Sequence, residues 1–239
     1  FDHVKFGYSK EKIIIKDFSL KVKSGQKIAI VGPTGSGKTT LVKLLMRFYP
    51  LKDGAIYIDD CNIKNFNRED YRHAFGMVLQ DAWLFSGTIM ENLRYGKLDA
   101  TDEEVIASAK AAHIDHFIKT LPGGYSMELN EETSNVSSGQ KQLLTIARAI
   151  LANPKVMILD EATSNVDTRT EVLIQKAMDE LMKGRTSFII AHRLSTIQNA
   201  DVILVLNHGD IVEVGTHEEL LKKKGFYYDL YNSQFEKVS

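Results

Sequence analysis

The chain has 239 residues, of which 44% are hydrophobic and 26% charged, and its formal net charge at pH 7 is −1. These values are ordinary for a globular protein of one large domain or two small ones, and the balanced charge argues against a surface for nucleic acids or anionic membranes. Cys61 is the only cysteine, so an intrachain disulfide is excluded, which suits a reducing compartment. No apolar run approaches the ~20 residues that a membrane-spanning helix needs, so we expect that this stretch does not itself cross a membrane.

Residues 1–27 alternate short apolar stretches with polar turns, which predicts an antiparallel hairpin region. Tyr8 lies in a Gly-Tyr-Ser turn within it. An aromatic ring at this place can stack on an adenine, but a tyrosine that packs on the sheet is the commoner case. The residues alone leave both roles open.

The stretch from Gly32 to Thr39 reads Gly-Pro-Thr-Gly-Ser-Gly-Lys-Thr and fits the phosphate-loop pattern G-x-x-x-x-G-K-[ST] without a mismatch. An apolar, β-branched run before it (27–31) predicts a buried strand, and apolar residues at helical spacing after it (40–47) predict a helix. Strand, glycine loop and helix bring backbone N–H groups and a helix N-terminus together around an anion. An ordinary glycine-rich turn is the alternative, but it does not explain the full pattern.

Two side chains of this loop have defined tasks in such a site. Lys38 can reach the β- and γ-phosphates of a nucleotide, and the Thr39 hydroxyl can ligate Mg²⁺. We expect nucleotide contacts from Gly32, Pro33, Thr34, Gly35, Ser36, Gly37, Lys38, Thr39 and Thr40.

Two further strands are predicted after the loop, at 55–59 and 75–79, and the second ends in Gln80. A polar amide at the carboxyl end of a buried strand faces the crevice where open α/β sheets bind ligands. Gln80 can therefore help to ligate Mg²⁺ or the attacking water, or it can simply cap the end of the strand.

From Thr101 to Thr120 the apolar period becomes helical, and Thr101 forms a capping box with Glu104. After a polar, turn-rich stretch, residues 139–151 are strongly amphipathic. Residues from about 82 to 150 thus predict a mainly helical insertion between two strands of the sheet. Residues 1–80 and 151–239 form the rest of what we expect to be a single domain.

A continuous apolar strand is predicted at 155–159, and it stops at Asp160 and Glu161. The first acid can hold Mg²⁺ through water, and the second can orient or deprotonate a water that attacks the γ-phosphate. The alternative is an acidic turn after a core strand. The phosphate loop in the same chain favours the catalytic role.

One more apolar strand at 187–191 ends at His192. A histidine there can hydrogen-bond the γ-phosphate and the attacking water, although a lone histidine is more often structural. Two short strands follow, and a C-terminal helix begins near Thr216, with Glu219 completing a second capping box.

Together these motifs resemble the nucleotide-binding domain of an ATP-binding cassette (ABC) transporter, in the family's order and over essentially the whole chain. Tyr8 lies where the family has its adenine-stacking aromatic. The loop from Gly32 to Thr39 matches Walker A, and Gln80 matches the glutamine of the Q-loop.

The later motifs of the family are similar as well. Val136-Ser-Ser-Gly-Gln140 stands where the signature L-S-G-G-Q is found, and 156–160 followed by Glu161 matches Walker B and the catalytic glutamate. Residues 164–167, with Ser164 and Asp167, resemble the D-loop, and His192 resembles the switch histidine.

The resemblance implies an α/β fold, a P-loop NTPase (RecA-like) core with an N-terminal antiparallel β subdomain and an inserted α-helical subdomain. It implies ATP and Mg²⁺ as ligands, with Thr39, Gln80 and Asp160 at the metal. It also implies head-to-tail pairing of two domains, with ATP held between one Walker A loop and the other domain's signature. The signature residues here are Ser137, Ser138, Gly139 and Gln140. Hydrolysis assisted by Glu161 would reopen the pair and drive membrane domains between inward- and outward-facing states.

Residues 81–92 resemble the version found in exporters whose membrane and nucleotide domains share one polypeptide, and Phe1 is not an initiator Met. We therefore expect the excised C-terminal ATPase domain of such an exporter, at the cytoplasmic face of the cell membrane. The implied partners are a second nucleotide-binding domain, the transmembrane domains of the same polypeptide and a transported drug, lipid or peptide, with no nucleic acid.

The signature departs from the family pattern at Ser138, where the first glycine is usual, and at Val136, where leucine is usual. Because serine has a Cβ that glycine lacks, close backbone approach to a nucleotide would be impaired. One hypothesis is a heterodimer, in which a different subunit supplies an intact signature. The other is a homodimer that tolerates the substitution, and the residues do not choose between them.

Three other functions share the phosphate loop. A DNA-repair ATPase of this superfamily would place hundreds of coiled-coil residues between Walker A and the signature, whereas Lys38 and Gly139 are only about a hundred residues apart. A translation-associated protein would normally carry two cassettes in one chain. A small-molecule kinase has no need of a signature helix or a D-loop.

Overall fold

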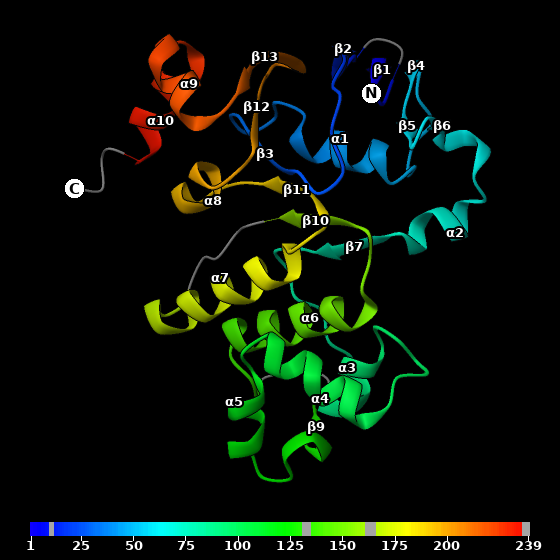
Figure 1. Cartoon of the computed structure of the whole chain (residues 1–239), viewed down its shortest axis with the longest axis vertical. Helices are drawn as coiled ribbons and strands as arrows, with labels where there is room; N and C mark the ends of the chain where they lie inside the picture. The colour runs from blue at the N-terminus through cyan, green and yellow to red at the C-terminus, as the bar shows by residue number, and fades with distance from the viewer. Residues whose placement is uncertain (10–11, 131–134, 161–165, 236–239) are drawn as a thin grey trace. The chain divides into compact units, whose positions relative to one another are not determined.

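The computed structural model describes residues 1–9, 12–130, 135–160 and 166–235 (Figure 1). The chain divides into two compact units, the first of residues 1–75, 158–161 and 186–239 and the second of 76–157 and 162–185. Residues 162–185, which the sequence analysis assigned to the core, thus group with the helical unit. The reason is that α7 (Thr168–Met182) packs along α6 (Ser138–Ala152).

A six-stranded sheet in the order β13-β12-β3-β11-β10-β7 carries the phosphate loop. Its strands are β3 (Lys27–Val31), β7 (Phe75–Val78), β10 (Val156–Asp160), β11 (Thr186–Ile190), β12 (Val202–Asn207) and β13 (Asp210–Gly215). β3 runs parallel to both β11 and β12, and only the pairing of β13 with β12 is antiparallel among these. Ile28, Ala29 and Ile30 are buried in the middle of the sheet, which agrees with the apolar run that predicted this strand. The predicted α/β architecture is confirmed.

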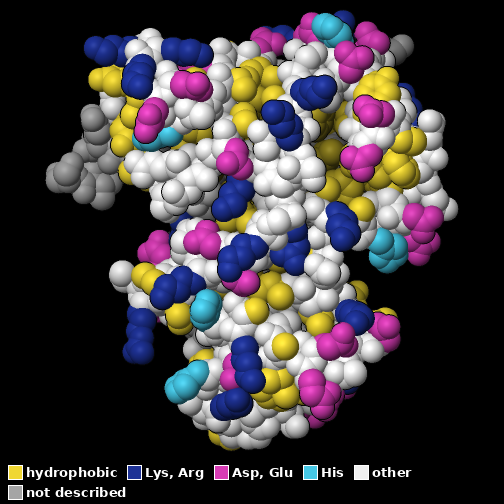
Figure 2. All heavy atoms as spheres, in the orientation of Figure 1, with side chains coloured by type: hydrophobic (Ala, Val, Ile, Leu, Met, Phe, Trp, Pro, Cys, Tyr) yellow, Lys and Arg dark blue, Asp and Glu magenta, His cyan; other side chains and the backbone are white. Residues whose placement is uncertain are grey.

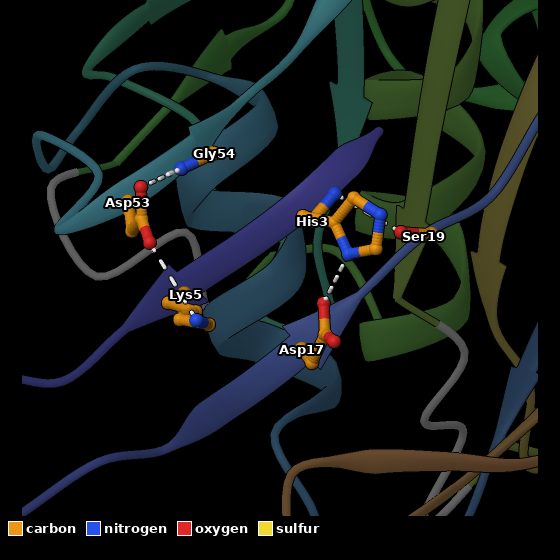
Figure 3. Close-up of polar contacts among 6 residues, drawn as sticks. All are labelled: His3, Lys5, Asp17, Ser19, Asp53 and Gly54. Carbon is orange, nitrogen blue, oxygen red and sulfur yellow. Dashed lines mark hydrogen bonds and ion pairs between the residues drawn. The ribbon is translucent and has the colours of Figure 1, made fainter.

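The N-terminal segment forms a separate three-stranded antiparallel sheet, in the order β2-β1-β4. Its strands are β1 (Asp2–Phe6), β2 (Ile15–Phe18) and β4 (Asp53–Ala55). The predicted hairpin region is confirmed by the antiparallel pairing of β1 with β2. Val4 and Phe6 point into the core. Figure 3 shows polar side chains of this sheet, including the His3 Nδ1 contact with Asp17 at 2.9 Å and the Lys5–Asp53 ion pair at 3.5 Å. Because these pairs are exposed, the buried apolar face stabilises the sheet more than they do.

The single strand predicted at 55–59 is wrong. The chain changes partner at the buried residue Ile56: β4 pairs with β1, whereas β5 (Tyr57–Ile58) pairs with β6 (Cys61–Asn62). A continuous apolar pattern cannot reveal such a change, because both short strands need the same residue types.

The first unit also holds five α-helices and one 3₁₀ turn among its described residues. They are α1 (Lys38–Leu45), η1 (Ile63–Asn65), α2 (Arg68–His73), α8 (Leu194–Gln198), α9 (His217–Lys223) and α10 (Phe226–Phe235). The capping box predicted for Thr216 and Glu219 is confirmed at the start of α9.

The second unit is mainly helical (Figure 1). Besides α6 and α7 it holds α3 (Ile89–Arg94), α4 (Asp102–Ala111), α5 (Asp115–Thr120), η2 (Gly124–Ser126), and the short strands β8 (Gly87–Thr88) and β9 (Glu128–Leu129). The capping box of Thr101 and Glu104 is confirmed at the start of α4. The helical segment 101–120 is divided into α4 and α5, with His113 between them in the left-handed region at φ +58°. Of the helices in the described ranges, none combines the length and the apolarity that crossing a bilayer requires.

Candidate active site

The loop between β3 and α1 is shaped by glycines whose backbone conformations disfavour side chains. The φ angles are +151° at Gly32, +80° at Gly35 and +107° at Gly37. A Cβ on Gly32 would lie 2.2 Å from the Leu206 carbonyl oxygen and 2.8 Å from the Ser36 hydroxyl oxygen. Only glycine at position 32 therefore lets the loop pass so close to β12.

Lys38 folds back over this loop. Its Nζ donates hydrogen bonds to the carbonyl oxygens of Gly32 at 2.7 Å and Pro33 at 3.0 Å. Burial lowers the pKa of Lys38, and the charge of Asp160 opposes that shift. The ammonium group is thus held at the mouth of the glycine loop by weak carbonyl acceptors, which phosphate oxygens can replace.

The hydroxyl groups of the loop differ in their surroundings. Ser36 is buried, and its Oγ has no hydrogen-bond partner among the described residues. Thr39 is exposed at the start of α1, whereas Thr40 is buried and its Oγ1 lies 3.3 Å from the Tyr8 hydroxyl. An unpartnered buried hydroxyl within a glycine cradle suits a bound polar group such as a phosphate oxygen.

Tyr8 meets this loop from the N-terminal sheet. Its ring packs edge-on against Phe6 and Tyr49, with centroid distances of 5.0 and 5.1 Å. The residue is nevertheless 51% exposed. Both roles considered for Tyr8 are compatible with this position, since the ring packs on the sheet and also keeps much of its surface open.

Asp160 lies at the end of β10 and His192 follows β11. Both His192 and Lys38 are close enough to Asp160 for their charges to act on its carboxyl group. Burial raises the pKa of Asp160, while the charges of His192 and Lys38 lower it in part. His192 is exposed. The structure therefore brings Lys38, Asp160 and His192 together at one edge of the sheet, as the carboxyl ends of parallel strands require.

The donors at this edge fit Mg²⁺. The Thr39 hydroxyl and the Asp160 carboxylate are hard oxygen ligands, which Mg²⁺ prefers. Within the described ranges, no group of three or more His, Cys, Asp or Glu side chains could hold a metal by itself. A Mg²⁺ ion here would consequently take most of its ligands from substrate phosphates and water, as is usual for nucleotide sites.

The signature residues start α6 in the second unit. Ser137 is the N-cap: its Oγ accepts the Gln140 N–H at 3.3 Å, and its own N–H donates to Gln140 Oε1 at 2.8 Å. A Cβ on Gly139 would lie 2.5 Å from Thr170 Cγ2 and 3.0 Å from Val166 Cγ1. Gly139 is therefore required by the packing of α7 on α6, whereas Ser138 is exposed on the first turn.

The remaining predicted residues are less constrained or lie outside the described residues. Asp167 is the N-cap of α7, where its Oδ1 accepts the Thr170 N–H at 3.0 Å, and these hydrogen bonds lower its pKa. Gln80 follows β7 and is exposed. Glu161 and Ser164 lie outside the described residues.

One cluster escaped the sequence analysis. The Arg148 guanidinium of α6 donates to Asn92 O at 2.8 Å, Asn92 Oδ1 at 3.0 Å and Trp83 O at 3.1 Å. It also lies over the rings of Trp83 and Tyr95, at 5.9 and 5.4 Å from their centroids. Both rings remain exposed, at 61% and 57%. The sequence does show an arginine within an otherwise apolar helix face. It does not show what this arginine binds, because its partners lie more than fifty residues away in the sequence.

Comparison with known proteins decides the family. A family model described as ABC transporter matches residues 15–164. The chain belongs to the ABC transporter family. The alternatives of a DNA-repair ATPase, a translation-associated cassette and a small-molecule kinase are accordingly set aside.

The relatives of this ABC domain are longer proteins. It is 57% identical over 237 residues to the ABC transporter ATP-binding protein YfiC of Bacillus subtilis, covering 99% of this chain and 39% of the relative. It is 56% identical over 230 residues to a fatty acid ABC transporter ATP-binding/permease protein of Mycobacterium tuberculosis, covering 96% and 36%. The chain thus spans about two fifths of the length of the curated relatives it matches.

A solved structure extends the comparison to the fold. The bacterial Atm1-family ABC exporter with ATP bound matches with a TM-score of 0.92 and 43% identity, over 100% of this chain and 42% of that one. ATP-binding domains of this family are ATPases, and this chain is such a domain.

Proposed function

We propose that this ABC ATPase domain powers the export of a substrate across a membrane, by pairing head to tail with a second nucleotide-binding domain when ATP is bound. The observation that supports this most directly is the arrangement of Lys38, held by the carbonyls of Gly32 and Pro33 within electrostatic range of Asp160. Such an arrangement suits the phosphates of a nucleotide with Mg²⁺.

On the Walker side, Lys38 would exchange its two carbonyl contacts for β- and γ-phosphate oxygens. Thr39 and Asp160 would hold Mg²⁺, with Gln80 as a further oxygen ligand. When bound, the metal would neutralise the negative charge that develops on the phosphates. Tyr8 would place its exposed ring against the adenine.

For hydrolysis, Glu161 would orient and deprotonate the attacking water, and His192 would hydrogen-bond the γ-phosphate and that water. On the partner side, the N-terminus of α6 would meet the γ-phosphate of the other domain's ATP with the Ser137 hydroxyl and the Gly139 N–H. Ser138 occupies the first turn of that helix. If its Cβ is tolerated next to the partner's ATP, two copies can pair as a homodimer; if it is not, a different subunit must supply an intact signature.

The exposed rings of Trp83 and Tyr95, fixed by Arg148, form an apolar surface suited to a segment of the transmembrane domains. We place those domains in the same polypeptide, with this domain at the cytoplasmic face of the membrane. The names of two relatives refer to fatty acid transport and to multidrug export, which supports a lipid or a drug as substrate, and a peptide is the third candidate.

Pairing is tested with Glu161→Gln, which should stall hydrolysis but keep the phosphate contacts. Light scattering with and without ATP and Mg²⁺ should show an ATP-dependent dimer. The matched variant carries Ser138→Gly in addition. If only the Ser138→Gly variant dimerises, the natural partner is a different subunit. If neither dimerises although both bind ATP, self-pairing through this signature is refuted.

Export is tested separately with the full polypeptide reconstituted in lipid vesicles. ATP-dependent movement of a fluorescent lipid or drug should occur in the wild type and be lost with Lys38→Ala. Transport that continues at the wild-type rate in Lys38→Ala would contradict the proposal.

A further inference from the structure

The C-terminal helix α10 is anchored to the first unit by a buried polar contact. Tyr227 is 2% exposed, and its hydroxyl lies 2.7 Å from His217 Nδ1 of α9. Burial raises the pKa of Tyr227 and lowers the pKa of His217, so it favours the uncharged form of both groups, and the tautomer of the imidazole decides which of them donates. The Tyr231 ring packs at an inclination of 52° against the same imidazole, with a centroid distance of 5.4 Å.

A second anchor holds the start of the helix. The Tyr227 N–H donates to Glu213 Oε2 of β13 at 2.7 Å. A Cβ on Gly225 would lie 1.9 Å from Glu213 Oε1, so a larger residue there would make this carboxylate shift away from the backbone. The position of α10 on β13 and α9 is thus defined by hydrogen bonds as well as by packing.

The anchored face of α10 also lines a cavity at the phosphate loop. Tyr227, Leu230 and Tyr231 form one wall of a cavity of about 110 Å³. The other walls include Gly32, Thr34 and Lys38 of the phosphate loop, together with Ala191 and His192 after β11. Residues three and four apart lie on one face of a helix, which is why these three α10 side chains point the same way and Tyr228 does not join them.

The two loops that meet at this cavity leave neighbouring parallel strands, β3 and β11, which are in register through Ile30 and Ile190. Backbone hydrogen bonds between β3 and β11 fix the two strands, but these hydrogen bonds do not hold the loops that follow the strand ends. A helix that lines the same cavity as both loops limits how far they can move into it, and so restricts their movement relative to each other. For a transferred phosphoryl group such restriction matters, because a displacement of about 1 Å can cost about 100-fold in rate.

We propose that α10 is a positioning element of the ATPase site, in which the aromatic face of Tyr227 and Tyr231 sets the place of His192 relative to Lys38. This inference rests on the proposed role of those two residues in ATP hydrolysis. In this role, Tyr227 and Tyr231 touch neither the nucleotide nor the attacking water. They act through the loops that they support.

The test substitutes Tyr231→Ala and measures steady-state ATP hydrolysis by the purified protein. The kcat should fall about tenfold, while the KM for ATP stays within about twofold, because nucleotide binding depends mostly on the glycine loop and Tyr8. Tyr231→Phe keeps the ring and should retain the wild-type kcat. Tyr228→Ala, on the same helix but outside the cavity, is the matched control and should leave both parameters unchanged.

The outcomes separate the inference from the proposed function. A wild-type kcat in Tyr231→Ala, or an equal loss in Tyr228→Ala, would overturn the positioning role. A loss of kcat that disappears when the variant is assayed well below its melting temperature would also overturn it, since that loss would be one of stability. If Tyr231→Ala does not fold, Leu230→Ala is assayed in the same way. Wild-type turnover that survives Lys38→Ala would instead refute the proposed function itself.

Discussion

Gly209 supports the phosphate loop from the turn between β12 and β13, and its replacement by alanine should destabilise the protein strongly. Its N–H donates to the Ser36 carbonyl oxygen at 3.0 Å. Its φ is +84°, and a Cβ would lie 1.7 Å from the Ile14 carbonyl oxygen. Alanine in the left-handed region costs about 1–2 kcal/mol. Forcing apart two backbone segments costs typically about 1–3 kcal/mol more. We therefore expect Gly209→Ala to lower the free energy of unfolding by about 2–5 kcal/mol.

Gly25 is the matched control, because its φ is +80° and nothing lies within 4 Å of a Cβ built on it. Gly25→Ala should cost only the backbone term of about 1–2 kcal/mol. Urea unfolding of both variants and the wild type, followed by circular dichroism, gives the two free energies of unfolding. Equal losses in the two variants would contradict this expectation, since the close approach at Ile14 would then carry no energy. Gly209→Ala should also reduce ATP hydrolysis, because the Ser36 carbonyl loses its donor if the turn shifts.

Three further predictions concern caps, pH and the arginine cluster. Thr101→Ala removes the N-cap of α4 and should cost about 1 kcal/mol in urea unfolding, whereas Thr101→Ser should cost much less. The lowered pKa of His217 means that the unfolded chain takes up a proton at a higher pH than the folded chain does. The contribution of His217 to the free energy of unfolding is therefore complete above about pH 6.5 and is lost as the pH falls through the lower folded pKa. The free energy of unfolding, measured between pH 5 and 8, should fall less steeply on acidification in His217→Gln; identical slopes would contradict this. Arg148→Lys should cost about 1.5–3 kcal/mol, because lysine cannot reproduce the fork that binds Asn92 and Trp83, and a wild-type melting curve would disprove that role.

The parts of the fold that were predictable are those with a local physical cause. The strand at 27–31 coincides with β3 because a buried parallel strand must be apolar throughout. The helix starts at Thr101 and Thr216 were predictable because a capping box is complete within four residues. The helix predicted at 139–151 agrees with α6 to within one residue at each end.

The parts that were missed depend on contacts between distant segments. Residues 55–59 read as one strand in the sequence because nothing in their composition reveals that β4 and β5 have different partners. The helix α7 was not predicted, although Asp167 was an available N-cap signal for it.

The same distinction holds for the site. The glycine loop and Lys38 were identifiable from their spacing, since a phosphate cradle needs those residue types in sequence. The need for glycine at 32 arises from Leu206, on a strand far along the chain, and was not visible beforehand. The wall that Tyr227 and Tyr231 add to the cavity beside Lys38 likewise has no local signature.

The ATPase site is tested most directly by phosphate release from ATP with Mg²⁺ by the purified protein, compared with Lys38→Ala and with Lys43→Ala. Lys43 lies on α1 as Lys38 does, but outside the glycine loop, so it controls for loss of a lysine from that helix. Turnover should depend on Mg²⁺, and it should be abolished in Lys38→Ala and preserved in Lys43→Ala. Turnover that is indifferent to Lys38, or equally damaged by both substitutions, would contradict the assignment of this loop as the ATPase site.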